Sequence, residues 1–250
     1  MKYLSIDIGI TNVGVCIMTL PSESETLLPL KKNKSQKHPY PRKEQTFQLI
    51  QESKIERWSL DSIGFSWESA DFLVPSICKH VQSYIEKYRV DVLLIERQDN
   101  RAKKKIYALM YGLYAYFLDK LPTRLVHASA KIKVCQMLGI EKEKSTKTKK
   151  RSSKHNYQQN KSVAVDACEL LIHHKIIPPT LLDKTNALVE FKRLKKNDDV
   201  ADAFLQAIAF HIWKPPLKLR QQQKQPKTKR KKRTLDQSKQ TPSRKRRKKI

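Results

Sequence analysis

Acidic residues are scarce in this chain. The sequence has 24 Asp and Glu against 52 Lys and Arg, which gives a formal net charge of +28. Such a charge implies a polyanionic partner, and nucleic acid is the default interpretation. A ribosome or an anionic membrane surface would produce the same bias.

Cysteine pairs and long hydrophobic runs are also missing. The four cysteines, Cys16, Cys78, Cys135 and Cys168, lie far apart and form no CxxC pair, which argues against a zinc knuckle. Most of them lie among apolar residues, so we predict small core residues in a reducing compartment. No stretch approaches the length of apolar residues that a transmembrane helix needs, so no membrane span is expected.

The order of the predicted elements indicates an α/β domain. Strands are predicted at 2–9, 12–20, 54–60, 90–96 and 124–128, and helices at 69–88, 102–120, 129–138, 161–175 and 198–213. A meander followed by strand–helix alternation predicts a mixed five-stranded sheet with helices against its faces.

Three polar, basic segments lie inside or after this predicted domain, which spans 1–213. The stretch 21–53 is predicted to be a surface insertion, and 141–160 a second one that is mobile. Residues 214–250 are rich in Lys and Arg, contain Asp236 as their one acid, and are predicted to be a disordered tail.

The tail contains two dense basic clusters, Lys229–Arg233 and Arg244–Lys249. Each is typical of a nuclear localisation signal or of a nonspecific grip on DNA, and the two functions are compatible. The tail favours a nuclear location, with a mitochondrion or a viral replication site as the alternatives.

Four carboxylates lie where a buried charge would be costly. Asp7 lies inside one apolar strand, and Glu96 ends another. Asp199 and Asp202, three residues apart, share one face of the last predicted helix. Several unpaired carboxylates of this kind repel one another, so together they suggest a shared cation.

Carboxylates from different elements are the ligands that a metal-dependent nuclease needs. Two divalent ions about 3.5–4 Å apart can activate a water and stabilise the leaving oxygen of a phosphodiester. Mg²⁺ prefers oxygen ligands and keeps several waters, so three or four Asp or Glu side chains suffice.

Each of these acids also has a purely structural explanation. Asp7 could accept hydrogen bonds at a strand end, and Glu96 could pair with Arg97 or Arg101. Asp198 and Asp199 could cap a helix. Taken together, these explanations require three independent coincidences.

Three segments resemble the RuvC-type Holliday junction resolvases. They are Ser5–Asn12 (SIDIGITN), Leu94–Gln98 (LIERQ) and Lys195–Ala203 (KKNDDVADA), in the order expected for that family. The pattern is most similar to the fungal mitochondrial and poxviral branch. Mitochondrial members commonly carry an N-terminal extension that this sequence does not show, so we expect a mitochondrial location less than the others.

The resemblance implies an RNase H-like fold, a homodimer, Mg²⁺ or Mn²⁺, and paired symmetric nicking of four-way DNA junctions in recombination and repair. By the same resemblance, Asp7, Glu96, Asp199 and Asp202 would be the catalytic metal ligands. Asp198 is an alternative to Asp199, because Asp198 and Asp202 also share a helix face.

Two features near these acids point to DNA and to a partner subunit. A polar, mostly basic group follows Glu96: Arg97, Gln98, Arg101, Lys103, Lys104 and Lys105. We predict that these residues contact DNA; the alternative is that they form a solvated helix start. The stretch 106–118 has no polar face, so it is either an internal helix or part of the interface of a C₂ dimer that makes two cuts.

Two other functions compete with a junction resolvase. One is an RNase H-like nuclease acting on RNA or an RNA–DNA hybrid, but in that branch the Glu is expected on a helix, whereas Glu96 ends a predicted strand. The other is a noncatalytic nucleic-acid-binding protein, and the presence of all four carboxylates argues against it.

Overall fold

The computed structural model describes residues 1–21, 43–64, 68–98, 103–140, 153–173, 191–194 and 196–213. The chain divides into two units, Met1–Lys214 and Pro215–Ile250. The second unit, with the predicted basic tail, lies outside the described residues, as do 22–42 and 141–152 within the predicted insertions.

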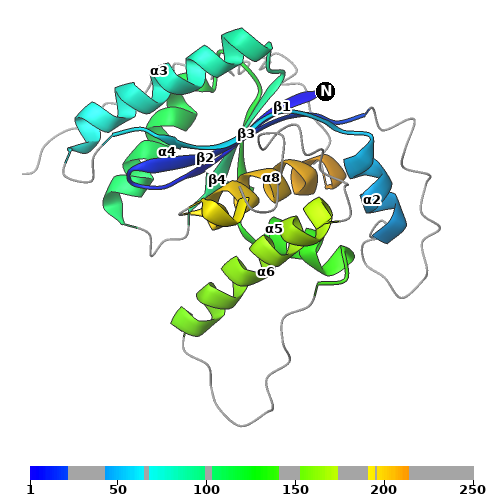
Figure 1. The fold of residues 1–250 in the computed structure, drawn as a ribbon. Coiled ribbons are helices and arrows are strands. Elements are labelled where there is room, and N and C mark those ends of the chain that lie inside the picture. Colours follow the sequence, from blue (N-terminus) through cyan, green and yellow to red (C-terminus); the bar gives the residue numbers. More distant parts are fainter. Residues whose placement is uncertain are drawn as a thin grey trace, which may run out of the picture. The chain divides into compact units, whose positions relative to one another are not determined.

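A mixed five-stranded sheet forms the centre of the first unit (Figure 1). Its strands are β1 (Lys2–Ile8), β2 (Asn12–Thr19), β3 (Lys54–Ser62), β4 (Val92–Arg97) and β5 (Thr123–His127), in the spatial order β3-β2-β1-β4-β5. The strands β1, β2 and β3 pair antiparallel, whereas β4 is parallel to β1 and to β5. The predicted mixed five-stranded sheet is therefore confirmed.

Helices cover both faces of the sheet (Figure 1). One face carries α3 (Ala70–Tyr88) and α4 (Lys104–Phe117), and the other carries α5 (Ser129–Met137), α6 (Ser153–His173) and α8 (Asn197–Ile212). Because both faces are covered, the central strand β1 is buried along almost its whole length. Within the described part of the chain, no helix combines the length and hydrophobicity that a bilayer-spanning segment needs.

The alternation of side chains along β1 assigns the two faces different chemistry. Leu4 and Ile6 pack into the apolar core beneath α3 and α4. Tyr3 points the other way, where its hydroxyl lies 3.2 Å from Nδ1 of His211 at the end of α8. Since successive side chains of a strand point to opposite faces, Asp7 also faces α8.

Two helical segments differ from the sequence-based expectations. Helix α2 (Lys43–Gln51) lies within the stretch 21–53, and its Leu49 and Ile50 are buried in the core beneath α8. Helix α6 begins at Ser153, inside the stretch 141–160 that was expected to be mobile. The segments 43–51 and 153–160 are mostly polar, with Phe47, Leu49 and Ile50 in the first and Tyr157 in the second as their large apolar residues, so hydrophobic periodicity does not reveal them.

Candidate metal centre

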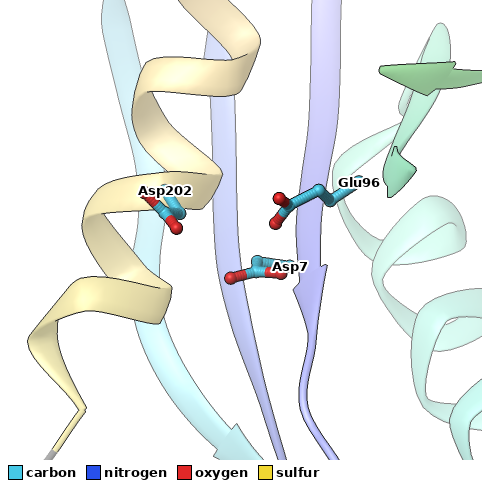
Figure 2. Close-up of side chains that lie close together, drawn as sticks. All are labelled: Asp7, Glu96 and Asp202. Carbon is cyan, nitrogen blue, oxygen red and sulfur yellow. The ribbon is translucent and has the colours of Figure 1, made fainter. Parts of the chain in front are cut away.

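Three buried carboxylates from three different elements meet on the α8 side of the sheet. Asp7 comes from β1, Glu96 from β4 and Asp202 from α8, and one carboxylate oxygen of each lies within 4.8 Å of the others. Figure 2 shows their side chains pointing toward one another. Each residue is less than a tenth exposed.

The parallel pairing of β1 and β4 brings the first two acids together. The register places Ile6 of β1 opposite Ile95 of β4. The next residue on each strand is an acid, Asp7 and Glu96, so the two carboxylates leave neighbouring strands at the same level. Residues 89 positions apart thereby become neighbours.

The third acid depends on how α8 lies across the sheet. Gly14 of β2 lets the helix backbone approach closely, since a Cβ there would lie 2.1 Å from the carbonyl oxygen of Asp199. Trp58 of β3 donates its indole N–H to the carbonyl of Val200 at 2.8 Å. These two contacts fix the first turn of α8, and Asp202 follows on the face toward the sheet.

A buried lysine lies among the three acids. The ammonium of Lys131, on α5, is 3.2 Å from Oε1 of Glu96 and also forms an ion pair with Oδ2 of Asp202. Lys131 is not among the site residues predicted from the sequence. A signal was present, because Lys131 precedes Val134 and Cys135 by three and four residues and so lies on the buried face of its helix.

The protonation of the cluster follows from burial and from this one ammonium. Burial, and then the charge of Glu96, raise the pKa of Asp7 well above its usual range. Burial alone would raise the pKa of Glu96, but Lys131 and a hydrogen bond from Asp7 outweigh it and lower that pKa. Burial also raises the pKa of Asp202 to about 6. Asp7 is thus the acid that is protonated most readily, whereas Lys131 stabilises the charge of Glu96.

The two acids in the first turn of α8 are held by other lysines. Lys161 of α6 forms an ion pair with Asp198, and its Nζ lies 3.7 Å from Oδ1 of Asp199. Nζ of Lys196 lies 3.6 Å from Oδ2 of Asp199. Neither acid belongs to the group formed by Asp7, Glu96 and Asp202, so the choice of a fourth ligand stays a prediction.

The chemistry of this group suits a hard divalent cation. All the available donors are carboxylate oxygens, which Mg²⁺ and Mn²⁺ prefer. Oδ1 of Asp202 is buried and has no hydrogen-bond partner, and a bound ion would satisfy it. The residues present therefore fit the predicted metal.

The predicted DNA-contacting residues start beside the cluster. Arg97 ends β4 and is exposed. Gln98 follows it, and its backbone N–H donates to Sδ of Met110 at 3.3 Å. Arg101 lies outside the described residues.

The three predicted lysines lie at the start of α4. Lys103 and Lys104 are exposed. The ammonium of Lys105 donates instead to the backbone carbonyl of Glu68, which links α4 to the segment before α3. Two of the three lysines are therefore available at the surface.

No family model matches the sequence, and no curated protein matches it either. Solved structures do match. The yeast mitochondrial Holliday junction resolvase Ydc2 is 18% identical, with a TM-score of 0.51 over 84% of this chain and 78% of that one. Thermus thermophilus RuvC in complex with its Holliday junction substrate (12% identity, TM-score 0.47) and the fowlpox virus resolvase with Holliday junction DNA (15%, 0.44) each align over 84% of this chain and 96% of theirs.

These similarities concern the arrangement of the backbone. The strand order β3-β2-β1-β4-β5, with its antiparallel meander and two parallel strands, is flanked by helices on both faces in this chain. With the structural match to Ydc2, this arrangement identifies the fold as RNase H-like.

Proposed function

We propose that this protein is a metal-dependent endonuclease that resolves four-way DNA junctions by paired symmetric nicks, in DNA recombination and repair. The observation that carries the proposal is the convergence of Asp7, Glu96 and Asp202. The fold supports it, because the matching yeast structure is a Holliday junction resolvase. The position of Glu96 on a strand favours a junction over an RNA–DNA hybrid as the substrate.

The three clustered acids would hold Mg²⁺ or Mn²⁺, with Asp199 or Asp198 as a fourth ligand. The bound ion would supply an activated water and stabilise charge on the scissile phosphate. The chain itself contributes the geometry. Before an ion binds, Lys131 donates to Glu96 and Asp202 and so keeps both carboxylates together, while the strands β1 and β4 hold Asp7 and Glu96 rigidly.

Basic side chains near the acids would bind the phosphates of the junction. Arg97, Lys103 and Lys104 are exposed and follow Glu96 in the chain. The net charge of +28 would draw in strands that the acids alone would repel.

A homodimer would supply the two active sites that paired nicks require. The surface of α3 and α4 exposes Phe72, Tyr111, Tyr116 and Leu118, which are 72%, 50%, 44% and 38% exposed. An open groove of about 410 Å³ lies in the same region, lined by Val74 of α3 and Gly112 of α4. We propose that a second copy of this chain covers these four exposed side chains, because a dimer with a C₂ axis uses the same patch on both subunits.

A cleavage assay on three labelled substrates tests the function. The protein is incubated in Mg²⁺ with a four-way junction, a linear duplex and an RNA–DNA hybrid. We expect paired symmetric nicks in the junction alone. Cleavage of the hybrid would instead favour an RNase H-type activity, and binding without cleavage in Mg²⁺ and in Mn²⁺ would favour a noncatalytic protein.

A further inference from the structure

Lys131 lies where it can take the place of a metal ion. Its ammonium contacts Glu96 and Asp202, two of the three acids that would bind that ion. The side chains of Lys131, Glu96 and Asp202 are each about a tenth exposed. A buried charge of this kind is tolerated only because its partners are charged and close.

An ammonium and a divalent ion compete for the same carboxylates. Lys131 already holds Oε1 of Glu96 and Oδ2 of Asp202, so an ion bound in the cluster would have to share these two side chains with it. Two positive charges held a few Å apart in a buried site repel strongly, because little solvent screens them. Lysine is suited to this role, since its charge ends a flexible four-carbon stem that can turn away.

Without any cation, the cluster would be unstable. Glu96 on the sheet and Asp202 on the helix would face each other in a buried site, and repulsion between their charges would push α8 away from β4. The lysine removes this problem in the metal-free protein, since it links Glu96 on the sheet to Asp202 on the helix.

We propose that Lys131 is a resident cation of this site: it holds the carboxylates together in the absence of metal, and it lowers the affinity for the first divalent ion by competing for Glu96 and Asp202. The inference rests on the proposed function of the cluster as a metal centre. Replacing Lys131 should therefore strengthen metal binding in the absence of DNA, whereas replacing a residue that helps to hold the ion would weaken it.

The test measures Mn²⁺ binding to the whole chain without DNA, by calorimetry and by electron paramagnetic resonance. We compare the wild type with Lys131→Met, which removes the charge and keeps much of the stem. The variant is expected to bind the first Mn²⁺ at least ten-fold more tightly. Its melting temperature is expected to be lower than that of the wild type without metal, and to rise more steeply as Mn²⁺ is added.

Lys133→Met is the matched control. Lys133 lies on the same helix, is exposed, and stands 5.7 Å from the centroid of the Trp213 ring. The substitution changes the net charge equally, and we expect an affinity within about two-fold of the wild type because an exposed charge is screened. If Lys131→Met proves too unstable to purify, Lys131→Gln makes the same comparison with an uncharged donor.

Two results would overturn the inference, and they are distinguishable. Unchanged or weaker Mn²⁺ binding in Lys131→Met, with clear binding in the wild type, would reject the resident cation and leave the metal centre intact. An absence of Mn²⁺ binding in both proteins would reject the metal centre itself, and the inference with it.

Discussion

Asp7, Glu96 and Asp202 are far apart in the sequence, and two backbone constraints bring them to the centre. The parallel register of β1 and β4 places the first two side by side. Asp202 depends on Gly14, because only a residue without a side chain allows the start of α8 to approach β2 this closely. The centre therefore relies as much on that glycine as on the acids.

Asp7→Asn is the most direct test of the acids. We expect the variant to bind a four-way junction normally and to cleave it roughly 100-fold more slowly or worse. Even the mutation of a residue that only contacts a metal ligand lowers metal affinity or activity by about 10–100-fold. The measurement is single-turnover cleavage beside a gel-shift titration. Asp71→Asn, an exposed acid on α3, is the control and should cleave normally. Full activity in Asp7→Asn would remove Asp7 from the site.

Gly14→Ala tests the close approach of α8. The new methyl would lie 2.1 Å from the carbonyl oxygen of Asp199, and this backbone atom, unlike the end of a side chain, cannot rotate out of the way. We expect a loss of about 1–3 kcal/mol in the free energy of unfolding, the usual cost of overpacking, together with weaker Mn²⁺ binding. Gly112→Ala, which meets only the side chain of Val74, is the control for metal binding. Metal affinity unchanged by Gly14→Ala would show that α8 is positioned independently of this contact.

At the scale of elements, a second polar cluster lies away from the metal centre and attaches α3 to the sheet. The carboxylate of Asp61 on β3 accepts hydrogen bonds from Arg57 (2.8 Å), Ser59 (2.9 Å), Tyr84 (2.5 Å) and Nε2 of His80 (3.0 Å). Burial alone would raise the pKa of Asp61, but the hydrogen bonds from His80, Tyr84 and Arg57 outweigh it and hold that pKa well below its usual value.

This cluster predicts an acid-sensitive contribution to stability. Because the pKa of Asp61 is lower in the folded protein than in the unfolded chain, its stabilisation is complete above about pH 4. It is lost as the pH falls below that value. Asp61→Asn should cost about 2–3 kcal/mol of unfolding free energy at pH 7, and this difference from the wild type should shrink on acidification. Urea unfolding of both proteins between pH 2 and pH 7 measures it, and a difference independent of pH would contradict the assignment.

The elements differ in how far the sequence allows them to be predicted. The strands β1 and β4 were predicted because each is a continuous apolar run, and Asp7 and Glu96 were found because they interrupt or end those runs. Helix α2 was missed because its buried side chains are few and its surroundings polar. Lys131 was missed because a lysine in a short helix is usually solvated, and only the tertiary contact with Glu96 reveals its role.

At the scale of the whole folded unit, the two faces of the sheet carry different chemistry. The side of α8 holds the metal-binding candidates. The side of α3 and α4 exposes large apolar side chains such as Tyr111 and Leu118. The predicted apolar helix 106–118 is thus buried on one face only, through Leu109, Leu113 and their neighbours. A dimer joined through α3 and α4 would not cover the opposite face of the sheet, which holds the metal-binding candidates.

Charge introduced on the exposed face of α4 tests the proposed dimer. Tyr111→Lys and Leu118→Lys place like charges near the symmetry axis, so we expect a shift from dimer to monomer in size-exclusion chromatography with light scattering. Mn²⁺ binding should be unaffected, because these residues lie on the other side of the sheet. A dimer that survives both changes would place the interface elsewhere.

The four free cysteines are distributed unevenly between these two sides. Cys78 belongs to the core beneath α3 and α4, whereas Cys16, Cys135 and Cys168 belong to the core beneath α8. Burial raises the pKa of Cys78 to about 11 and that of Cys135 to about 12, so neither reacts readily with a thiol reagent while its side stays closed. The rate at which each thiol is labelled therefore reports which side of the sheet opens first. Labelling in the presence of Mn²⁺ also shows whether the ion slows the opening of the side that binds it.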